Sequence, residues 1–537
     1  MEFNVYPNIK DITFSSDGSL LATVTKNDTI SLWEVGGLDE LISWSCQRLG
    51  NYLKNSNADV GESDKGLCDG ISGIEKAGKI SISDKILVPT LTHPDKQAGV
   101  EAIAAGDFST ASKHLQASLK SNLNDPEARI YLNNARIGNQ KSYTIAVSVP
   151  ISDINGSLEI LRGVAQAQDD FNNWAKTQQG IIPIRVLIAD DRNDQKIAQE
   201  IAKQLANNPD VLGVVGHFSS SVTREATQVY KDKGLVAISP VSTSVQLSDV
   251  LGKSVFRTVP NDKVAAEKLA DYTLNSLKKQ KAILFYNSQN EYSCSLASEF
   301  TAAFSGERGK QLERDCSKYG TSPAIFQGKQ QGQILKPIDL FSPDINAANS
   351  LQGVDENTVL VLLGDTSKLN QSFEILKANK GNLPILAGDD VYGSKILGFF
   401  TKEKINNKKD MVVAISWHIE NHRESSFSTT SKNIWGNRDV NWRTVTAYDA
   451  AKALIAAIKQ NPNREAVATI LRSDSFTADG AIEKVQFLPS GDRDGNLMEL
   501  VKIVKPTSKS RSGYDYEFVP VENQTNSNQV TKSKTSK

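Results

Sequence analysis

The chain has 537 residues, a length that corresponds to several domains, with 39% hydrophobic and 23% charged residues. This composition is typical of a globular protein and excludes collagen-like, largely disordered and disulfide-dense classes. The 61 Lys and Arg residues balance 62 Asp and Glu residues, so the net charge is −1. Without a global basic field, nucleic acid and direct membrane insertion are not expected as partners.

Four cysteines, Cys46, Cys68, Cys294 and Cys316, are too few and too scattered for a disulfide framework or a zinc site, so free thiols are expected. Cys294 and Cys316 flank a predicted helix, but the sequence does not give the distance between them. No secretory signal and no apolar run long enough to span a membrane are visible. We therefore expect a cytoplasmic protein, or a periplasmic one if the N-terminus is truncated.

Residues 1–36 hold three short runs rich in β-branched residues, separated by turn signals, which predicts a β-meander. With Asp28 in a tight turn and Trp33 closing the third strand, the stretch resembles one blade of a WD40 propeller. A lone blade cannot bury both of its faces. Two explanations stay open: earlier blades belong to a missing part of the gene, or the unit is a remnant packed on the helix that follows.

The next segments are predicted to connect this blade to the main domain. Residues 37–54 have an amphipathic pattern that predicts a helix. Residues 55–97 are rich in Asp, Ser, Gly and Asn, which predicts a linker. A helical period over 98–139, around Gly106 and Pro126, resembles one tetratricopeptide (TPR) unit. A generic helical hairpin is the alternative, because one unit is fewer than a solenoid needs.

From residue 142 to 505, apolar strands alternate with amphipathic helices. Runs such as YTIAVSVPI (143–151) are followed by helical patterns, which indicates parallel sheets covered on both faces. A second cycle begins at KAILFYNSQ (281–289) and continues to PILAGDD (384–390). The sequence predicts an α/β fold with two doubly wound lobes, and the polar residues 506–537 predict a disordered tail.

This region resembles the type I periplasmic-binding-protein family, the two-lobed solute receptors that include the leucine/isoleucine/valine-binding proteins. The most specific part is GVVGHFSSSVTREATQVYKDKGLVAISPVSTS, residues 213–244, which follows the family's G-H-x-x-S-S pattern, a helix, and then I-S-P with small hydroxyl residues. The resemblance implies a two-lobed receptor that closes over a small ligand and delivers it to a membrane permease, without a cofactor or a metal.

Two clusters of hydroxyl residues follow neighbouring strands of the first predicted lobe. A helix N-terminus favours an anion, and ligands of open α/β sheets bind at the carboxyl edge of the strands. We therefore expect the clusters to bind the carboxylate of an amino acid, with simple helix capping as the alternative. The six residues are Ser219, Ser220, Ser221, Ser242, Thr243 and Ser244.

An amino acid also needs a partner for its ammonium group. Asp390 matches the family's acidic residue for that group, with the adjacent Asp389 as a substitute and Asp365 as a further acid at a strand end. Tyr292 matches the aromatic residue that contacts the ligand from across the cleft. The alternatives are a solvated loop carboxylate for Asp390 and a packing aromatic for Tyr292. An aliphatic amino acid is the first ligand we expect.

The primary interpretation is a non-enzymatic solute receptor for ABC-type transport or intracellular sensing, with protein partners through the N-terminal modules or a permease. The rival is a ligandless scaffold that combines WD40-like, TPR-like and binding-protein modules. An enzyme finds no support, because no phosphate-binding P-loop and no nucleophile elbow occur. His418 and His422 in WHIENH match no zinc motif.

Overall fold

The computed structural model describes the backbone of three strands near the N-terminus and most of the chain from residue 79 to residue 521. The latter part comprises residues 79–251, 254–307, 309–319, 332–405, 409–436, 438–495, 497–507 and 510–521. The chain divides into two units, Met1–Ala77 and Gly78–Lys537.

The first unit contains an antiparallel sheet of the strands β1 (Ile9–Phe14), β2 (Leu20–Thr25) and β3 (Ile30–Glu34), in the order β1-β2-β3. The strands coincide with the three β-branched runs. A three-stranded sheet does not by itself establish a propeller blade, so the WD40 resemblance stays a prediction. The predicted helix at 37–54 lies outside the described residues.

The first lobe of the second unit is built on a six-stranded sheet in the order β4-β6-β5-β7-β8-β9, with only the β4–β6 pair antiparallel. The strands from β5 to β9 are almost fully buried, because helices cover both faces of the sheet. The strands are β4 (Lys79–Ser81), β5 (Tyr143–Val149), β6 (Ile184–Asp190), β7 (Val211–Val215), β8 (Ala237–Ser239) and β9 (Val255–Arg257). The helices that follow them are α6 (Ile154–Ala175), α7 (Gln195–Asn207), α8 (Ser220–Lys231) and α9 (Gln246–Leu251).

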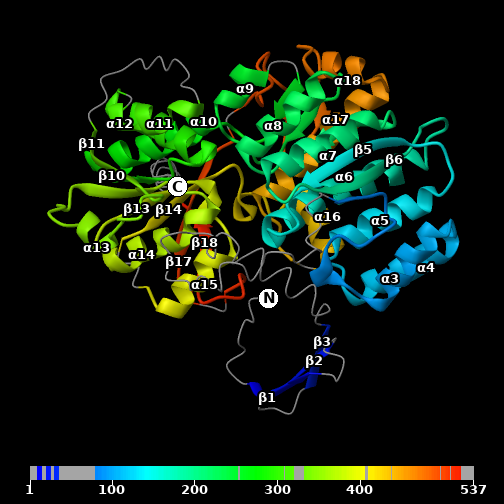
Figure 1. The fold of residues 1–537 in the computed structure, drawn as a ribbon, viewed down its shortest axis with the longest axis horizontal. Coiled ribbons are helices and arrows are strands. Elements are labelled where there is room, and N and C mark those ends of the chain that lie inside the picture. The colour runs from blue at the N-terminus through cyan, green and yellow to red at the C-terminus, as the bar shows by residue number, and fades with distance from the viewer. Residues whose placement is uncertain are drawn as a thin grey trace, which may run out of the picture. The chain divides into compact units, whose positions relative to one another are not determined.

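The second lobe is built on a seven-stranded sheet in the order β11-β10-β12-β13-β14-β17-β18, in which the pairs of β17 are antiparallel and the others parallel. Figure 1 shows the two lobes as separate layered bodies. The strands are β10 (Lys281–Tyr286), β11 (Gln333–Asp339), β12 (Thr358–Leu362), β13 (Ile385–Ala387), β14 (Met411–Ile415), β17 (Glu499–Val504) and β18 (Glu517–Pro520). The α-helices are α10 (Asp262–Asp271), α11 (Glu291–Ser305), α12 (Lys310–Asp315), α13 (Ala347–Ser350), α14 (Leu369–Asn379) and α15 (Ser394–Glu403). These two sheets agree with the predicted α/β fold of two doubly wound lobes.

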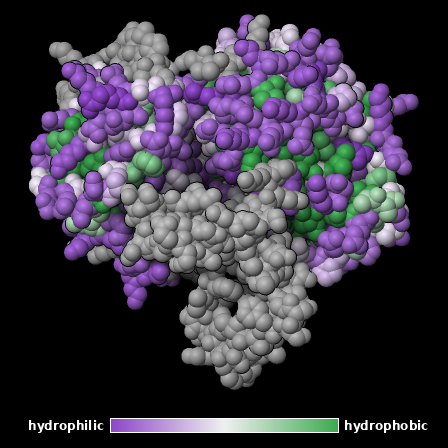
Figure 2. Space-filling view, viewed as in Figure 1, coloured by the Kyte–Doolittle hydropathy of each residue, from purple (hydrophilic) through white to green (hydrophobic). Residues whose placement is uncertain are grey.

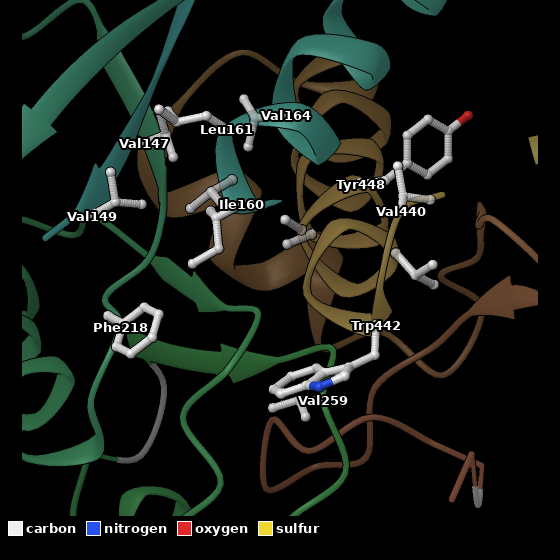
Figure 3. Packing of buried hydrophobic residues seen from close by; sticks show 14 of the residues in the cluster. Val147, Val149, Ile160, Leu161, Val164, Phe218, Val259, Val440, Trp442 and Tyr448 are labelled. Carbon is white, nitrogen blue, oxygen red and sulfur yellow. The ribbon is translucent and has the colours of Figure 1, made fainter. Parts of the chain in front are cut away.

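The chain returns from the second lobe to the first before it forms β17. The returning segment consists of the helices α16 (Ser426–Ile434), α17 (Trp442–Gln460) and α18 (Arg464–Leu471), and the short strands β15 (Ala478–Asp479) and β16 (Lys484–Val485). Helix α17 packs along α6 of the first lobe. Figure 3 shows Ile160 and Val164 of α6 in the apolar cluster that also holds Trp442 and Tyr448.

The segment before residue 142 differs from its prediction. Residues 79–97, predicted as linker, include β4, the 3-10 turn η1 (Pro89–Leu91) and the start of a helix. Three helices follow instead of a hairpin: α3 (Pro94–Ala104), α4 (Phe108–Ser121) and α5 (Pro126–Ile137). Helix α5 packs against α6, and Asn134 donates a hydrogen bond to the Val186 carbonyl of β6. The helices are therefore an integral part of the first lobe.

The predicted disordered tail is also wrong for residues 510–521. Strand β18 pairs with β17, and its Phe518 ring lies 4.3 Å from the ring centre of Tyr392. The side chains of Tyr516 and Phe518 are buried. These two aromatic residues stand isolated among polar ones, which is why low overall hydrophobicity suggested disorder.

Cys294 and Cys316 form a disulfide with a Cα–Cα distance of 5.6 Å, which corrects the expectation of free thiols for this pair. Cys294 lies in α11, and the turn after α12 brings Cys316 back against that helix. Hydrophilic residues dominate the visible face of both lobes (Figure 2). None of the described helices is long and apolar enough to cross a membrane.

Replacing Gly163 with alanine is expected to destabilise the first lobe, because α6 and α17 touch through their backbones at this residue. A Cβ on Gly163 would lie 2.6 Å from the Tyr448 amide nitrogen. Overpacking of this kind costs about 1–3 kcal/mol. Urea unfolding of the full chain measures the loss. Gly309→Ala is the control, because its new Cβ meets nothing nearer than 3.7 Å; equal losses in both variants would contradict the assignment.

The single variants Cys294→Ala and Cys316→Ala are each expected to lose about 3 kcal/mol of unfolding free energy, because the bond closes a loop with a sequence separation of 22. The double variant should lose little more than either single variant, since the first substitution already removes the bond. Urea unfolding under non-reducing conditions tests this. Additive losses in the double variant would show that the two thiols are not bonded.

Candidate functional site

The carboxyl ends of the two sheets face each other and enclose a small cavity of about 30 Å³. It lies between the loops after β6, β7 and β8 of the first lobe and those after β10, β12 and β13 of the second. Its lining residues are Asn193, Phe218, Ser219, Ser220, Val241, Asn290, Tyr292, Asp365, Thr366, Asp389, Asp390, Trp442 and Arg443. Such a volume holds water and not an amino acid in this arrangement of the lobes.

Three carboxylates from the second lobe line this cavity. Asp389 and Asp390 lie in the 3-10 turn η6 (Asp389–Val391), and Asp365 begins the 3-10 turn η5 (Thr366–Lys368) after β12. Tyr292 donates a 2.8 Å hydrogen bond to Oδ1 of Asp389, and the Thr366 amide donates to Oδ2 of Asp390. The cavity therefore has a concentration of negative charge suited to a cationic group.

Burial and the neighbouring Asp389 carboxylate raise the pKa of Asp390 to about 7, against the opposing effect of Arg443. Burial likewise raises the pKa of Asp389, although Arg443 and Tyr292 favour its charged form. A ligand ammonium placed here would favour ionisation of both acids.

Arg443 is the positive charge of this cavity, and it comes from the first lobe at the start of α17. Its guanidinium donates to the backbone carbonyls of Asp389 (3.2 Å) and Tyr392 (3.3 Å) in the second lobe. The distance from Nη2 to Oδ1 of Asp390 is 3.9 Å, which permits attraction but not a hydrogen bond. Arg443 thus links the two lobes across the cleft.

A second link between the lobes joins α8 to α11. Arg224 forms an ion pair with the buried Glu291. Ser244 donates a 3.1 Å hydrogen bond to Oε1 of the same carboxylate. The Val245 amide donates to the hydroxyl of Ser295. These contacts join the two lobes across the cleft.

Four of the eight predicted binding residues line the small cavity: Ser219, Ser220, Tyr292 and Asp390. Ser219 precedes α8 without a side-chain capping bond, so the structure does not favour the capping interpretation for it. Asp365 and Asp389, predicted as substitutes for Asp390, line the same cavity.

The other four predicted residues do not line the cavity. The hydroxyl of Ser242 lies 2.7 Å from that of Thr223 and donates to the Phe218 carbonyl. Ser244 donates to Gln246 and Glu291. Thr243 is buried, and Ser221 is half-buried on the first turn of α8. Ser242 and Ser244 therefore support the loop that carries Ser219 and Ser220, through the Phe218 carbonyl and the Ser220 hydroxyl.

A larger cavity of about 880 Å³ adjoins the small one and shares Phe218, Thr366, Asp390 and Arg443 with it. Its walls combine apolar side chains of α6 and α15 with charged residues. Among the latter, Arg162 pairs with Glu159, and Arg423 pairs with Glu420. Its further lining cations are Lys395, Lys432, Arg438 and Arg511. This volume is in the range of pockets for drug-sized ligands.

His418 also lines the large cavity, and burial lowers its pKa to about 4. Its predicted companion His422 instead binds Glu499 through Nε2 at 2.8 Å. Among the residues that the structure describes, no group of three His, Cys, Asp or Glu side chains is arranged to hold a metal ion.

Residues 142–323 match the family model described as periplasmic binding protein. Among curated relatives, an amino acid binding protein of Pseudomonas aeruginosa is 30% identical over 196 residues, 35% of this chain and 47% of its own length. A Leu/Ile/Val-binding protein homolog of Brucella abortus is 25% identical over 191 residues, with the same coverage. The chain thus spans about half the length of these curated relatives.

Solved structures share the fold over a longer stretch. An ABC transporter substrate-binding protein of Desulfitobacterium hafniense, solved with Leu, has a TM-score of 0.52 and 21% identity, covering 71% of this chain and all of its own. A branched-chain amino acid transporter substrate-binding protein of Streptococcus pneumoniae, solved with isoleucine, has a TM-score of 0.55, 17% identity and the same coverage.

Residues 142–323 are thus similar to periplasmic binding proteins, and the two-lobed region shares the fold of the solved substrate-binding proteins. The family match begins at residue 142, so it gives no support to the WD40-like and TPR-like resemblances, which stay predictions.

Sequence reasoning missed Trp442, Arg443 and Glu291. Trp442 and Arg443 begin a helix some fifty residues beyond Asp390, and nothing in the sequence indicated that this helix returns to the first lobe. Asn441, which caps the helix by accepting from the Arg443 amide, was a visible mark of a helix start. Asn441 indicated where the helix begins, but it did not indicate that this helix start lies in the cleft.

Stability is expected to fall as pH rises from about 4 to about 8, because burial raises the pKa of Asp262 to about 8. Asp262 is 1% exposed where the chain enters the second lobe. Over that range the folded state keeps a proton that the unfolded state has released, so unfolding becomes easier with pH. Asp262→Asn should raise the melting temperature at pH 8 and have a smaller effect at pH 5.

Asp344→Asn, an exposed acid of the second lobe, serves as the control for this titration. Its pH profile should run parallel to that of the unsubstituted protein. An Asp262→Asn profile that is also parallel would show that Asp262 does not carry the dependence.

Proposed function

We propose that the two-lobed region is a solute receptor whose lobes close over an amino acid or a similar small carboxylate for ABC-type transport. The observation that carries the proposal is the small cavity between the lobes, where buried acids of the second lobe meet the serines and Arg443 of the first. Closed over a zwitterion, these groups supply partners for both of its charges. The ligands named for the relatives, Leu and isoleucine among them, are consistent with this class.

Closure follows from the division of these partners between the lobes. A solute that binds groups on both lobes favours the closed state by the difference between its affinities for the two states. In our proposal Asp390 binds the ammonium, and Ser219 and Ser220 lie beside the carboxylate. The large cavity takes the remainder of the solute, and its charged walls favour a polar or long side chain over the aliphatic one first expected.

We further propose that the receptor works outside the reducing cytoplasm. The Cys294–Cys316 bond supports this, because structural disulfides persist in oxidising compartments. Delivery to a membrane permease is then favoured over intracellular sensing.

Thermal unfolding of the full chain against the twenty amino acids and a set of small carboxylates at millimolar concentration tests the function. A ligand at 100 times its Kd adds about 2.7 kcal/mol of stability, so one chemical class should raise the melting temperature selectively and saturably. No rise with any member would favour the ligandless scaffold over the receptor.

Asp390→Asn should abolish most of that rise by removing the negative partner of the ammonium. The matched control is Asp344→Asn, which changes an acid of the same lobe that lines neither cavity. An undiminished rise in Asp390→Asn would remove this residue from the binding site.

A further inference from the structure

Two buried hydrogen-bond donors at the start of α17 have no acceptor within the described part of the chain. Trp442 is 1% exposed and its indole Nε1 has no partner. Arg443 is 6% exposed and its Nε has none either. Leaving a donor buried and unpaired costs free energy, so such groups in a folded protein call for an explanation.

Both residues line the small cavity, and Arg443 borders the large one as well. The guanidinium carbon of Arg443 lies 4.3 Å from the centre of the Trp442 ring, so the two side chains are stacked neighbours. The terminal nitrogens of Arg443 are held by two carbonyls of the second lobe. Two hydrogen bonds thus fix the position of the guanidinium, and its Nε remains without an acceptor.

The nearby acids do not supply the missing acceptor. Asp389 accepts the hydroxyl of Tyr292, and Asp390 accepts the Thr366 amide. The nearest contact of the guanidinium to the Asp390 carboxylate is too long for a hydrogen bond. Because Trp442 and Arg443 both line the cavity, a solute that enters it is the source we consider for the missing acceptors.

The serine hydroxyls are weaker partners for an anion than a guanidinium. Those of Ser242 and Ser244 donate within the protein, whereas Ser220 accepts the Ser244 amide, a bond that does not use its own O–H. Ser219 lines the cavity without a capping bond, but its hydroxyl carries no charge. A charged guanidinium binds a carboxylate more strongly than a neutral hydroxyl does.

We propose that Trp442 and Arg443 bind the carboxylate of the amino acid while Asp389 and Asp390 bind its ammonium. This inference rests on the proposed function and assigns the carboxylate to α17 instead of the serines. The head group of the solute then bridges the first lobe, through α17, and the second lobe, through η6. Its side chain extends into the large cavity, which Arg443 and Asp390 also border.

Calorimetric titration of the full chain with matched acids and α-amides tests the assignment. The probes are L-alanine, L-leucine and L-glutamate, each paired with its α-carboxamide, which keeps the ammonium and removes the anion. Trp442→Phe removes one N–H and keeps an aromatic ring. It should weaken binding of the acids about tenfold to a hundredfold and binding of the amides clearly less, because the amide carbonyl accepts only a neutral hydrogen bond.

Trp417→Phe is the matched control. Trp417 is also buried and its Nε1 also lacks a partner among the described residues, but it lines neither cavity. This variant should bind acids and amides as the unsubstituted protein does. Arg443→Lys is the second test variant should Trp442→Phe fail to fold, and it should show the same selective loss for the acids.

Equal losses for acids and amides in the test variant would mean that the residue only packs the cleft, and would overturn the inference. The inference is also overturned if Ser219→Ala reduces the difference in binding affinity between each acid and its amide while the α17 variants do not. In both cases the receptor function stands. If no probe binds the unsubstituted protein, the proposed function fails and this inference fails with it.

Discussion

The contact between α6 and α17 is the constraint on which the candidate site depends. Gly163 lets the two helices approach until their backbones touch, and this approach fixes where α17 begins. Trp442 and Arg443 therefore enter the cleft from the first lobe although they follow the second lobe in sequence. Because a parallel sheet places its strand ends at one edge, the acids of the second lobe meet this helix start directly. The site therefore depends on the return of the chain to the first lobe in α17 as much as on the two sheets.

The electrostatic balance of the cleft explains why closure and binding belong together. Three carboxylates face a single guanidinium in a cavity that excludes all but water. Burial makes ionising both Asp389 and Asp390 unfavourable without a cation beyond Arg443, and the guanidinium keeps an unused donor. A zwitterion relieves both conditions at once, whereas an uncharged solute brings no cation to the acids. The charge distribution of the small cavity therefore favours a solute with an ammonium and a carboxylate, and the large cavity determines which side chain such a solute can carry.

The alternation of apolar strands and amphipathic helices was enough to predict two doubly wound lobes, because burial of both sheet faces leaves a strong pattern. Ser219 and Ser220 were predicted near the cleft by the rule that strand ends carry sites, and Tyr292 and Asp390 by the family resemblance. Arg443 was not, since its position depends on a crossing between lobes that leaves no local pattern. For the same reason the sequence of β4 was interpreted as a linker and that of β18 as a disordered tail. Short edge strands have little periodicity, and the strands they pair with lie far away in sequence. The disulfide could not be predicted, because the sequence does not give the distance between Cys294 and Cys316.

The outer strands of the two sheets limit how a second copy of the chain could pair with them. In the first lobe the edges are β4 and β9, each of three residues. In the second lobe, β18 has four residues and ends in Pro520, and the longer β11 carries Lys336 and Pro337 with a register shift against β10. Short, charged and proline-bearing edges offer few unpaired backbone groups to another chain. Among the strands that the structure describes in the two lobes, the outer edges are therefore short or interrupted, and a second copy would find little backbone there on which to extend either sheet.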